Sequence, residues 1–273
     1  MLIPHLENIT ALAAGAQHVL ALDSKGTVYG WGAKKLDQLS TKTSNRVPGA
    51  SMVPHACSMT KPGKFKDVVS IGAGAFHSFA VLRNGEVYAW GYNKYGQTGI
   101  PDHFTATGFQ IHSTTIPYAT RVPVFEEKQL FVDYITGGFK HSVAVTKDNM
   151  CLSWGSIADA ALGIQAADMD DQEIVYESAT VKTPLVLKEP GRATGIGQSV
   201  AATTGPTHTL VISSKGVAFG NVAFGWGSNR QYETSIIQQA ETLLPSELRG
   251  NGLDGKTVVA VAAGKEFSVL LTE

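Results

Sequence analysis

Residues 72–99 read GAGAFHSFAVLRNGEVYAWGYNKYGQTG. The apolar run that begins after His77 stops at Asn84-Gly85 and resumes through Trp90, a pattern that predicts two strands joined by a tight turn. The preceding stretch, VVSIGAG, is rich in β-branched and small residues and predicts another strand that can approach its neighbours closely. A Pro-containing strand such as RVPVF (121–125) or TPLVL (183–187) would complete a four-stranded antiparallel sheet.

The same unit recurs along the chain. Its histidine returns at spacings of 59, 64 and 67 residues, and after a further 59 a truncated fifth copy has Phe in that place. All four tryptophans lie in a Trp-Gly pair of a copy, and in the first three copies the tryptophan follows the histidine by thirteen residues. So regular a placement indicates a repeated structural unit. Its anchoring residues are His18, His77, His141, His208 and Phe267, together with Trp31, Trp90, Trp154 and Trp226.

The repeat predicts an all-β fold, a β-propeller in which each copy forms one blade. Strands dense in Ala and Gly fit where several sheets converge on an axis, and Trp and Tyr fill the wider space between blades. We expect a single propeller domain over residues 1–273, with repeats at about 9–67, 68–131, 132–197 and 198–256 and a partial one at 257–273. Two alternatives stay open: a propeller that closes with few blades, or an open arc with unpaired end strands.

Composition narrows the class of protein. With 43% hydrophobic and 16% charged residues, the chain can bury a sizeable core. The apolar runs are shorter than the ~20 residues of a membrane helix, and the first residues lack the pattern of a secretory leader, so we expect an intracellular protein without direct membrane contact. A net charge of -1 with no basic face gives no general affinity for nucleic acid. The two cysteines, Cys57 and Cys151, form no disulfide framework and lack zinc-ligand spacing.

The repeat resembles that of the regulator of chromosome condensation family, whose mark is a Gly-rich strand, His-Ser/Thr, a turn, aromatic-x-Trp-Gly and a loop ending in Gln-Leu-Gly or a variant. Residues 72–99 are a near-complete example, and the resemblance extends from about Ile9 to Glu273. It implies the seven-bladed propeller of that family, of which about five repeats are present. The order of inserts is most similar to the C-terminal two-thirds of a fungal, chromatin-bound guanine-nucleotide exchange factor for the small GTPase Ran.

We interpret the repeated His and Trp as structural, because four equivalent histidines are not expected to be four catalytic or metal-binding residues. The position just before the histidine differs in charge and size from copy to copy, so packing does not determine its identity. Function on repeat folds usually lies at such variable positions. The residues predicted to lie at one level and to face a partner are Gln17, Phe76, Lys140, Thr207 and Glu266.

The resemblance implies which partner this is. In the exchange factors, acidic and His side chains at this level act on the GTPase; here Gln17 stands where an acidic residue is expected and Lys140 where a histidine is expected. The family's β-hairpin wedge and basic N-terminal tail precede the repeat that contains His18, and we expect residues 1–273 to lack both. The leading hypothesis is a nuclear, exchange factor-like propeller that acts on a Ran-type small GTPase at chromatin, with nucleosomes or histones as a further partner. The alternative is a non-catalytic interaction scaffold of the same fold that has lost exchange activity.

Motifs for covalent chemistry are not found. The sequence has no Gly-x-Ser-x-Gly elbow, Walker loop or HExxH, so we expect no hydrolase or oxidoreductase activity, no catalytic residues, no cofactor, no metal and no small-molecule substrate. The acidic residues of 168–173 favour a solvated loop, with a cation or a basic partner as the alternative. The duplicated VAFG within 217–225 predicts either a bulged hairpin or an error in the gene sequence.

Overall fold

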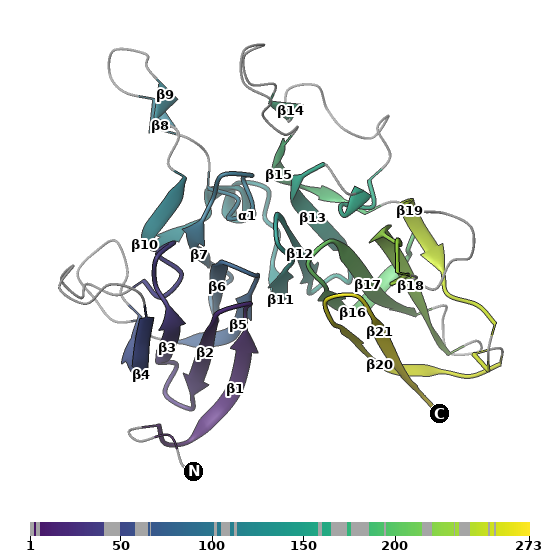
Figure 1. Ribbon diagram of the computed structural model, residues 1–273, viewed down its shortest axis with the longest axis horizontal. Helices are drawn as coiled ribbons and strands as arrows, with labels where there is room; N and C mark the ends of the chain where they lie inside the picture. Colours follow the sequence, from purple (N-terminus) through teal and green to yellow (C-terminus); the bar gives the residue numbers. More distant parts are fainter. Residues whose placement is uncertain are drawn as a thin grey trace. The chain divides into compact units, whose positions relative to one another are not determined.

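The computed structural model of the protein is built almost entirely of β-strands (Figure 1). It describes residues 3, 6–40, 50–57, 65, 67–100, 103–104, 110–111, 114–157, 160–164, 174–175, 186–193, 195–214, 220–231, 233–234, 241–250, 252–253 and 255–273. The single helix in these ranges is α1 (Pro123–Glu127), and they contain no helix with the length and apolar run that a bilayer crossing needs. The chain divides into two compact units, Met1–Ile135 and Thr136–Glu273.

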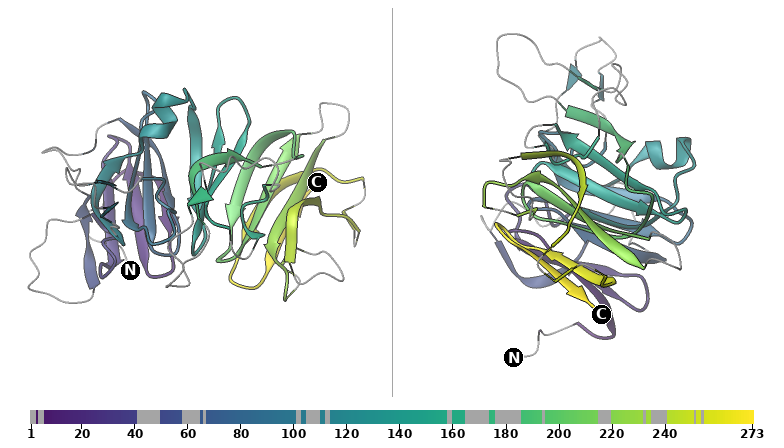
Figure 2. Two further views of the ribbon diagram at one scale, coloured as in Figure 1. Left: turned by 90° about the horizontal axis from the view of Figure 1, so that it is seen from above. Right: turned by 90° about the vertical axis from the view of Figure 1, so that its right-hand side faces the viewer.

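The first unit holds two four-stranded antiparallel sheets. The strands of the first sheet are, in order, β1 (Ile9–Ala14), β2 (His18–Asp23), β3 (Val28–Ala33) and β4 (Ala50–Ala56). Those of the second are β5 (Val68–Ala73), β6 (His77–Leu82), β7 (Val87–Tyr92) and β10 (Thr115–Arg121), while β8 (His103–Phe104) pairs with β9 (Gln110–Ile111). The two sheets lie side by side, with β5 packed against both β1 and β2 (Figure 2).

The strands from residue 132 onward form two further sheets and a hairpin. The first sheet has the order β11 (Val132–Gly137), β12 (His141–Thr146), β13 (Cys151–Ser156), β15 (Val186–Arg192) and β14 (Ile174–Val175). The next comprises β16 (Gln198–Thr204), β17 (His208–Ser214), β18 (Asn221–Ser228) and β19 (Glu241–Glu247). The hairpin consists of β20 (Val258–Ala263) and β21 (Ser268–Thr272). In the second unit β16 packs against β12, and β20 packs against β16 and β17.

The predicted inner strands and hairpins are confirmed, whereas one predicted outer strand is wrong. The segment RVPVF is not a strand, because β10 ends at Arg121 and Pro123 begins α1. Proline suits the first turn of a helix, where its missing N–H has no partner to lose and its φ is already helical. Of TPLVL, Val186 and Leu187 lie in β15; residues 183–185, 168–173 and 217–219 lie outside the described residues. One propeller domain over residues 1–273 stays a prediction.

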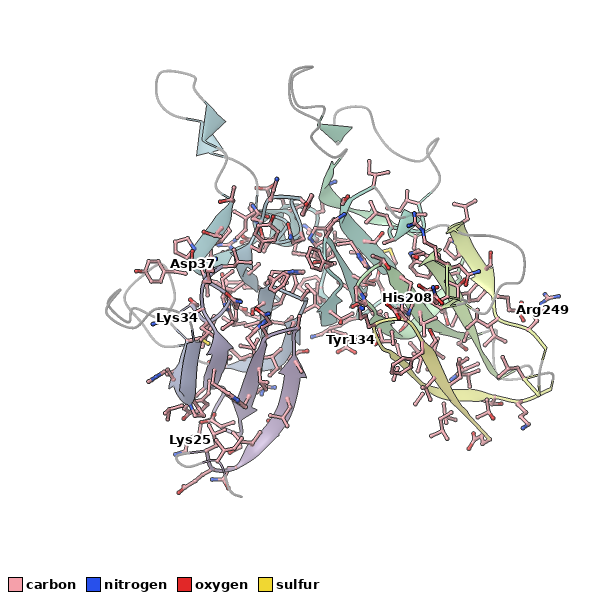
Figure 3. All side chains as sticks on the ribbon, viewed as in Figure 1. Lys25, Lys34, Asp37, Tyr134, His208 and Arg249 are labelled. Atoms are coloured by element: carbon pink, nitrogen blue, oxygen red, sulfur yellow. The ribbon has the colours of Figure 1, made fainter. Side chains whose placement is uncertain are left out.

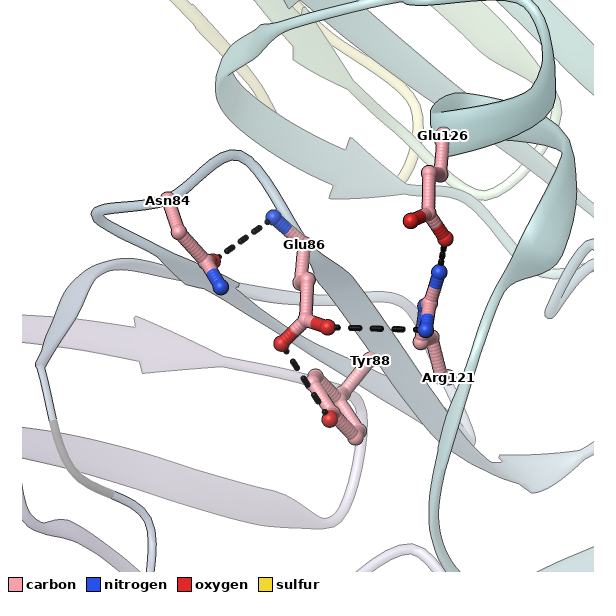
Figure 4. Close-up of polar contacts among 5 residues, drawn as sticks. All are labelled: Asn84, Glu86, Tyr88, Arg121 and Glu126. Atoms are coloured by element: carbon pink, nitrogen blue, oxygen red, sulfur yellow. Dashed lines mark hydrogen bonds and ion pairs between the residues drawn. The ribbon is translucent and has the colours of Figure 1, made fainter.

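Helix α1 is held mainly by packing. Val124 and Phe125 are buried, and burying a Phe side chain is worth roughly 2–3 kcal/mol. At the surface Arg121 pairs with Glu126 of α1, and its Nη1 lies 3.6 Å from Oε1 of Glu86 on the β6–β7 hairpin (Figure 4). These charged groups are partly exposed, so each pair contributes about 0–1 kcal/mol. The buried apolar side chains therefore contribute more to the stability of the helix than the ion pair to Glu126.

The glycine of each Trp-Gly pair is required by its backbone geometry. Gly32 and Gly91 have φ values of +107° and +97°, a region that L side chains rarely adopt. A Cβ atom on Gly91 would lie 2.6 Å from the Phe76 carbonyl oxygen, and one on Gly32 would lie 2.4 Å from that of Gln17. The third strand of a blade can approach the turn before the histidine only where no side chain intervenes.

We expect Gly91→Ala to lower the free energy of unfolding by about 3 kcal/mol. The left-handed φ costs an alanine roughly 1–2 kcal/mol, and the close contact between its Cβ and the backbone adds to this cost. The control is Gly195→Ala, since Gly195 has a φ of +78° and an added Cβ would meet nothing within 4 Å. Urea denaturation of both variants measures the difference. Equal losses in the two proteins would contradict the close approach.

Candidate partner-binding site

Each hairpin is entered through a four-residue turn that begins with glycine and ends with His or Phe. The glycine N–H donates to the carbonyl oxygen at the end of the turn, at 2.9 Å from Gly15 to His18 and at 2.8 Å from Gly264 to Phe267. The ring at the end of the turn folds back over the glycine, so that a Cβ on Gly15 would lie 2.3 Å from Cε1 of His18. The turn therefore needs glycine, and it gives the two residues in between a defined backbone position.

Neighbouring turns within a unit are joined through their backbones. In the first unit the Ala16 N–H donates to the Ala75 carbonyl oxygen at 3.1 Å. In the second unit the Phe139 N–H donates to the Pro206 oxygen at 2.8 Å, and a Cβ on Gly205 would lie 2.6 Å from the Gly264 oxygen. These contacts bring Gln17 and Phe76 to one level in the first unit, and Lys140, Thr207 and Glu266 to one level in the second. That all five residues lie in a single ring stays a prediction.

The backbone of the residue before the histidine is held by its carbonyl oxygen. In four copies this oxygen accepts the N–H of the residue after Trp-Gly, at 2.7–2.9 Å; the acceptors are Gln17, Phe76, Lys140 and Thr207. Because this bond uses only backbone atoms, it does not depend on the side chain. An amide, a phenyl ring, an ammonium and a hydroxyl can therefore all occupy the position before the histidine. Gln17 and Glu266 are exposed, and the other three residues are half-buried. The carboxylate of Glu266 lies 3.0 Å from Nζ of Lys265 in an exposed pair of little energetic weight.

The repeated histidines are buried between sheets. Nε2 of His18 lies 2.8 Å from Oγ of Ser78 on the next sheet. Ser78 Oγ donates to the Gln38 carbonyl oxygen at 2.9 Å, and Nε1 of Trp90 donates to the same oxygen at 2.9 Å. One loop carbonyl thus receives two hydrogen bonds from the following sheet, and the histidine completes the network from its own sheet.

The second unit repeats this network. Nε2 of His141 lies 3.1 Å from Oγ1 of Thr209, and both Thr209 Oγ1 and Nε1 of Trp226 donate to the Ala161 carbonyl oxygen, at 3.2 and 2.8 Å. His208, which lies close to the C-terminal hairpin (Figure 3), has its Nε2 3.3 Å from Oγ of Ser268. The Ser268 hydroxyl in turn bonds to the Glu233 carbonyl oxygen.

The hydroxyl determines which nitrogen of the histidine carries the proton. Because Ser78 has a single hydroxyl proton and donates it to Gln38, it accepts from His18, whose Nε2 is therefore protonated. Nδ1 of His18 has no hydrogen-bond partner in the described part of the chain, so a second proton would bury an unpaired charge. Burial accordingly lowers the pKa of His18 to about 4 and that of His141 to about 3. Burial also lowers the pKa of His208.

Sequence reasoning missed the role of the residue after the histidine. The hydroxyl of Ser78 contacts His18 of the preceding repeat, 60 residues earlier in the chain, and that of Thr209 contacts His141, 68 residues earlier. The signal was present in the His-Ser and His-Thr dipeptides, but a dipeptide does not tell which sheet its second residue faces. Val19 occupies this place in the first copy, and residues 1–273 contain no earlier copy whose histidine it could bind.

The sequence of residues 1–270 matches the protein-family model of the RCC1-like domain. The chain belongs to this family. Protein pim1 of Schizosaccharomyces pombe is 29% identical over 269 residues, which cover 97% of this chain and 46% of that protein. Guanine nucleotide exchange factor SRM1 of Saccharomyces cerevisiae is 24% identical over 263 residues, which cover 96% of this chain and 50% of that protein. The chain therefore spans about half the length of these RCC1-like relatives.

Solved structures show which fold the family shares with this chain. The crystal structure of Prp20p from Saccharomyces cerevisiae, described with its binding properties to Gsp1p and histones, aligns at a TM-score of 0.82 with 21% identity. The alignment covers 99% of this chain and 57% of Prp20p. The sheets of the RCC1-like chain are accordingly blades of a β-propeller, and the four complete sheets and the C-terminal hairpin correspond to about five repeats.

We expect the free energy of unfolding to fall as the pH drops from about 6.5 to about 4. In this window the unfolded chain protonates its histidines while His18 and His141 stay neutral in the folded chain, so each contributes up to about 1.4 kcal/mol per pH unit. Above about 6.5 these rings are neutral in both states and add no pH dependence. Urea titrations across this range measure the slope, and His18→Phe, which copies the natural Phe267, should reduce it. An unchanged slope in the variant would contradict the neutral, buried ring.

A double-mutant cycle between sheets tests the hydrogen bond itself. Ser78→Ala should lower stability by about 1–3 kcal/mol, because it leaves the buried Nε2–H of His18 without an acceptor. In a His18→Phe background the same substitution should matter less, with a coupling energy of about 1 kcal/mol measured by thermal or urea unfolding. Strictly additive effects would show that the pair does not interact.

Proposed function

We propose that the chain is the GTPase-binding part of an RCC1-type guanine-nucleotide exchange factor, acting on a Ran-type small GTPase at chromatin in the nucleus. The observation that carries the proposal is the turn before each histidine. In all five copies its glycine N–H bonds to the carbonyl oxygen at the end of the turn, while the side chain that it presents changes from Gln17 to Lys140 to Glu266. A constant frame with variable side chains is typical of a surface shaped by a partner.

The chemistry of these side chains favours a protein partner. Phosphate recognition needs a group of cations, whereas the second unit presents a cation at Lys140, a hydroxyl at Thr207 and an anion at Glu266 on neighbouring turns. The first unit adds the amide of Gln17 and the ring of Phe76. A mixed set of this kind complements the mixed polar surface of a folded protein.

Exchange needs no covalent step. A protein that binds the nucleotide-free form of a GTPase more tightly than the loaded form promotes release, because its binding energy offsets the lost phosphate and magnesium contacts. Support for this activity comes from the relatives: SRM1 is named a guanine nucleotide exchange factor, and the Prp20p structure was described with its binding to Gsp1p and histones. Histones are accordingly the second partner that we propose.

The experiment follows the release of a fluorescent nucleotide from a Ran-type GTPase. We expect the chain to accelerate release, and Lys140→Glu to reduce the acceleration by about tenfold through a lost contact at the turn. The matched control is Lys147→Glu, because Lys147 is an exposed residue between β12 and β13, at the other end of the same strand. The control should release nucleotide at the unmodified rate. Release no faster than without the chain would overturn the exchange activity.

A second candidate is a scaffold of the same fold that binds without promoting exchange. Gln17 and Lys140 favour it, because they replace the acidic and His side chains that the resemblance leads one to expect. A pull-down with nucleotide-free GTPase and with nucleosomes separates the candidates. Capture of either partner together with an unassisted release rate would establish the scaffold, and capture with acceleration would exclude it.

A further inference from the structure

The loop that follows Trp-Gly carries a cation at the same place in three of the four complete repeats. The fourth residue after the tryptophan is a lysine or an arginine in the first, second and fourth repeats and an alanine in the third. The three cations are exposed: Lys35, Lys94 and Arg230. Packing does not determine the identity of an exposed loop residue, so a charge that returns there from repeat to repeat points to use by a partner.

The loop around each cation has a fixed shape. The N–H of the residue after the cation donates to a side-chain oxygen two residues further on, at 2.8–2.9 Å. The accepting side chains are buried. The donor and acceptor pairs are Leu36 with Gln38, Tyr95 with Gln97, and Gln231 with Glu233. Because the backbone beside the cation is already ordered, little conformational entropy is lost there when a partner binds.

The cations lie at the same end of the sheets as the turns before the histidines. The residue after Trp-Gly, two positions before each cation, is bonded to the turn through its N–H. In the first repeat the Ala33 N–H donates to the Gln17 oxygen at 2.7 Å. Figure 3 shows Lys34 at this end of the first sheet, whereas Lys25, in the turn between β2 and β3, lies at the other end.

The loops of Lys35 and Lys94 are neighbours in the first unit. The Asp37 carboxylate, two residues after Lys35, accepts the Thr115 hydroxyl at 2.7 Å. Thr115 is paired with Tyr92, two residues before Lys94, in the β10–β7 ladder. The two lysines are therefore placed so that one extended segment can contact both.

The carboxylates of these loops are engaged with groups other than the cations. Asp37 accepts the Thr115 hydroxyl, and Glu233 is buried and accepts the Gln231 N–H. In the part of the chain that the structure describes, no ion pair joins Lys35 or Lys94 to a carboxylate. Both ammonium groups are thus available to an anionic partner.

Aromatic side chains lie beside the cation of the second repeat. The rings of Tyr92 and Tyr95 meet edge to face, with their centroids 5.9 Å apart, and Nζ of Lys94 lies 6.0 Å from the centroid of Tyr95. Phe76 is joined to Tyr92 through its backbone oxygen, and all three rings are half-buried. The surface therefore presents apolar ring area and positive charge together.

We propose that the loops of Lys35 and Lys94 form a docking site for an acidic polypeptide segment that carries an aromatic side chain. Its carboxylates pair with the two lysines, and its ring packs against Tyr92 and Tyr95. A polypeptide fits better than a nucleic acid, because a nucleic acid has a charge on every nucleotide and needs a longer row of cations than a chain of net charge -1 presents here. The inference goes beyond the exchange activity, since this contact requires neither GTPase nor nucleotide.

The probe is a fluorescein-labelled peptide, Glu-Glu-Tyr-Glu-Glu-Tyr-Glu-Glu, and its binding to the chain is followed by fluorescence anisotropy. We expect the double variant Lys35→Glu/Lys94→Glu to weaken binding about tenfold or more, because two attractions become repulsions. Tyr95→Ala should weaken binding about threefold or more through the lost ring contact. The matched control is the double variant's counterpart at the other end of the sheet, Lys25→Glu, which should bind within about twofold of the unmodified chain.

Two further probes separate the classes of ligand. The same peptide with Gln in place of Glu should lose binding, and a single-stranded oligothymidylate of equal length should bind about fivefold more weakly than the acidic peptide. Any one of four results would overturn the proposal: no binding of the acidic peptide, equal losses in the double variant and in Lys25→Glu, equal binding of the Gln peptide, or tighter binding of the oligonucleotide.

Two separate measurements keep these results interpretable. Urea denaturation verifies that each variant is folded, and substitutions of exposed lysines should leave the midpoint nearly unchanged. Nucleotide release from a GTPase is measured in another experiment without the peptide. A failure of peptide binding therefore leaves the proposed exchange activity standing, and a failure of exchange leaves the docking site standing.

Discussion

A small hydrogen-bond network joins neighbouring sheets. One loop carbonyl oxygen accepts two protons from the sheet that follows, one from a tryptophan N–H and one from a hydroxyl. That hydroxyl in turn accepts a hydrogen bond from the histidine of the preceding sheet. In the first unit the carbonyl belongs to Gln38 and in the second to Ala161. Each of these polar groups would be costly to bury alone, and together they satisfy one another. The network therefore determines how two sheets must approach, while the free energy of their packing comes from apolar side chains such as Trp90 and Leu210.

The same arrangement separates positions that maintain the fold from positions that can change. The positions of Gly15 and His18 allow little choice of side chain, because the ring lies directly over the glycine, and the five copies hold only glycine at the first and His or Phe at the second. Of the two residues between them, Gln17 is held through its carbonyl oxygen, and its side-chain amide is exposed. A propeller blade can thus acquire a new surface without any change in its core, and membership of the RCC1-like family establishes the fold more firmly than the activity.

Much of this architecture can be predicted from sequence. The period of the histidine and Trp-Gly positions gives the number of repeats, and the alternation of apolar runs and turns gives the inner strands and hairpins. The outer strands are harder, because their pairing with the third strand is irregular and shifts register at the Trp-Gly pair. At Pro123 the sequence permits both an edge strand and a helix start; in the structure the helix begins there and buries Val124 and Phe125, a packing that the local sequence does not reveal. The partners of His18 could not be predicted, since they depend on which sheets become neighbours.

The offset between the histidine and its hydroxyl has a consequence for how such a chain can change in length. The histidine lies in one repeat and the hydroxyl that accepts its proton lies in the next, at nearly the same position within the repeat. This holds wherever the boundaries of a repeat are drawn. A genetic duplication or deletion of one whole repeat therefore restores the histidine–hydroxyl pair at the new junction, wherever within the repeat the break occurs. Loops between strands can still vary in length, as the spacings of 59, 64 and 67 residues show, but the loss or gain of part of a blade would leave an imidazole facing the wrong residue.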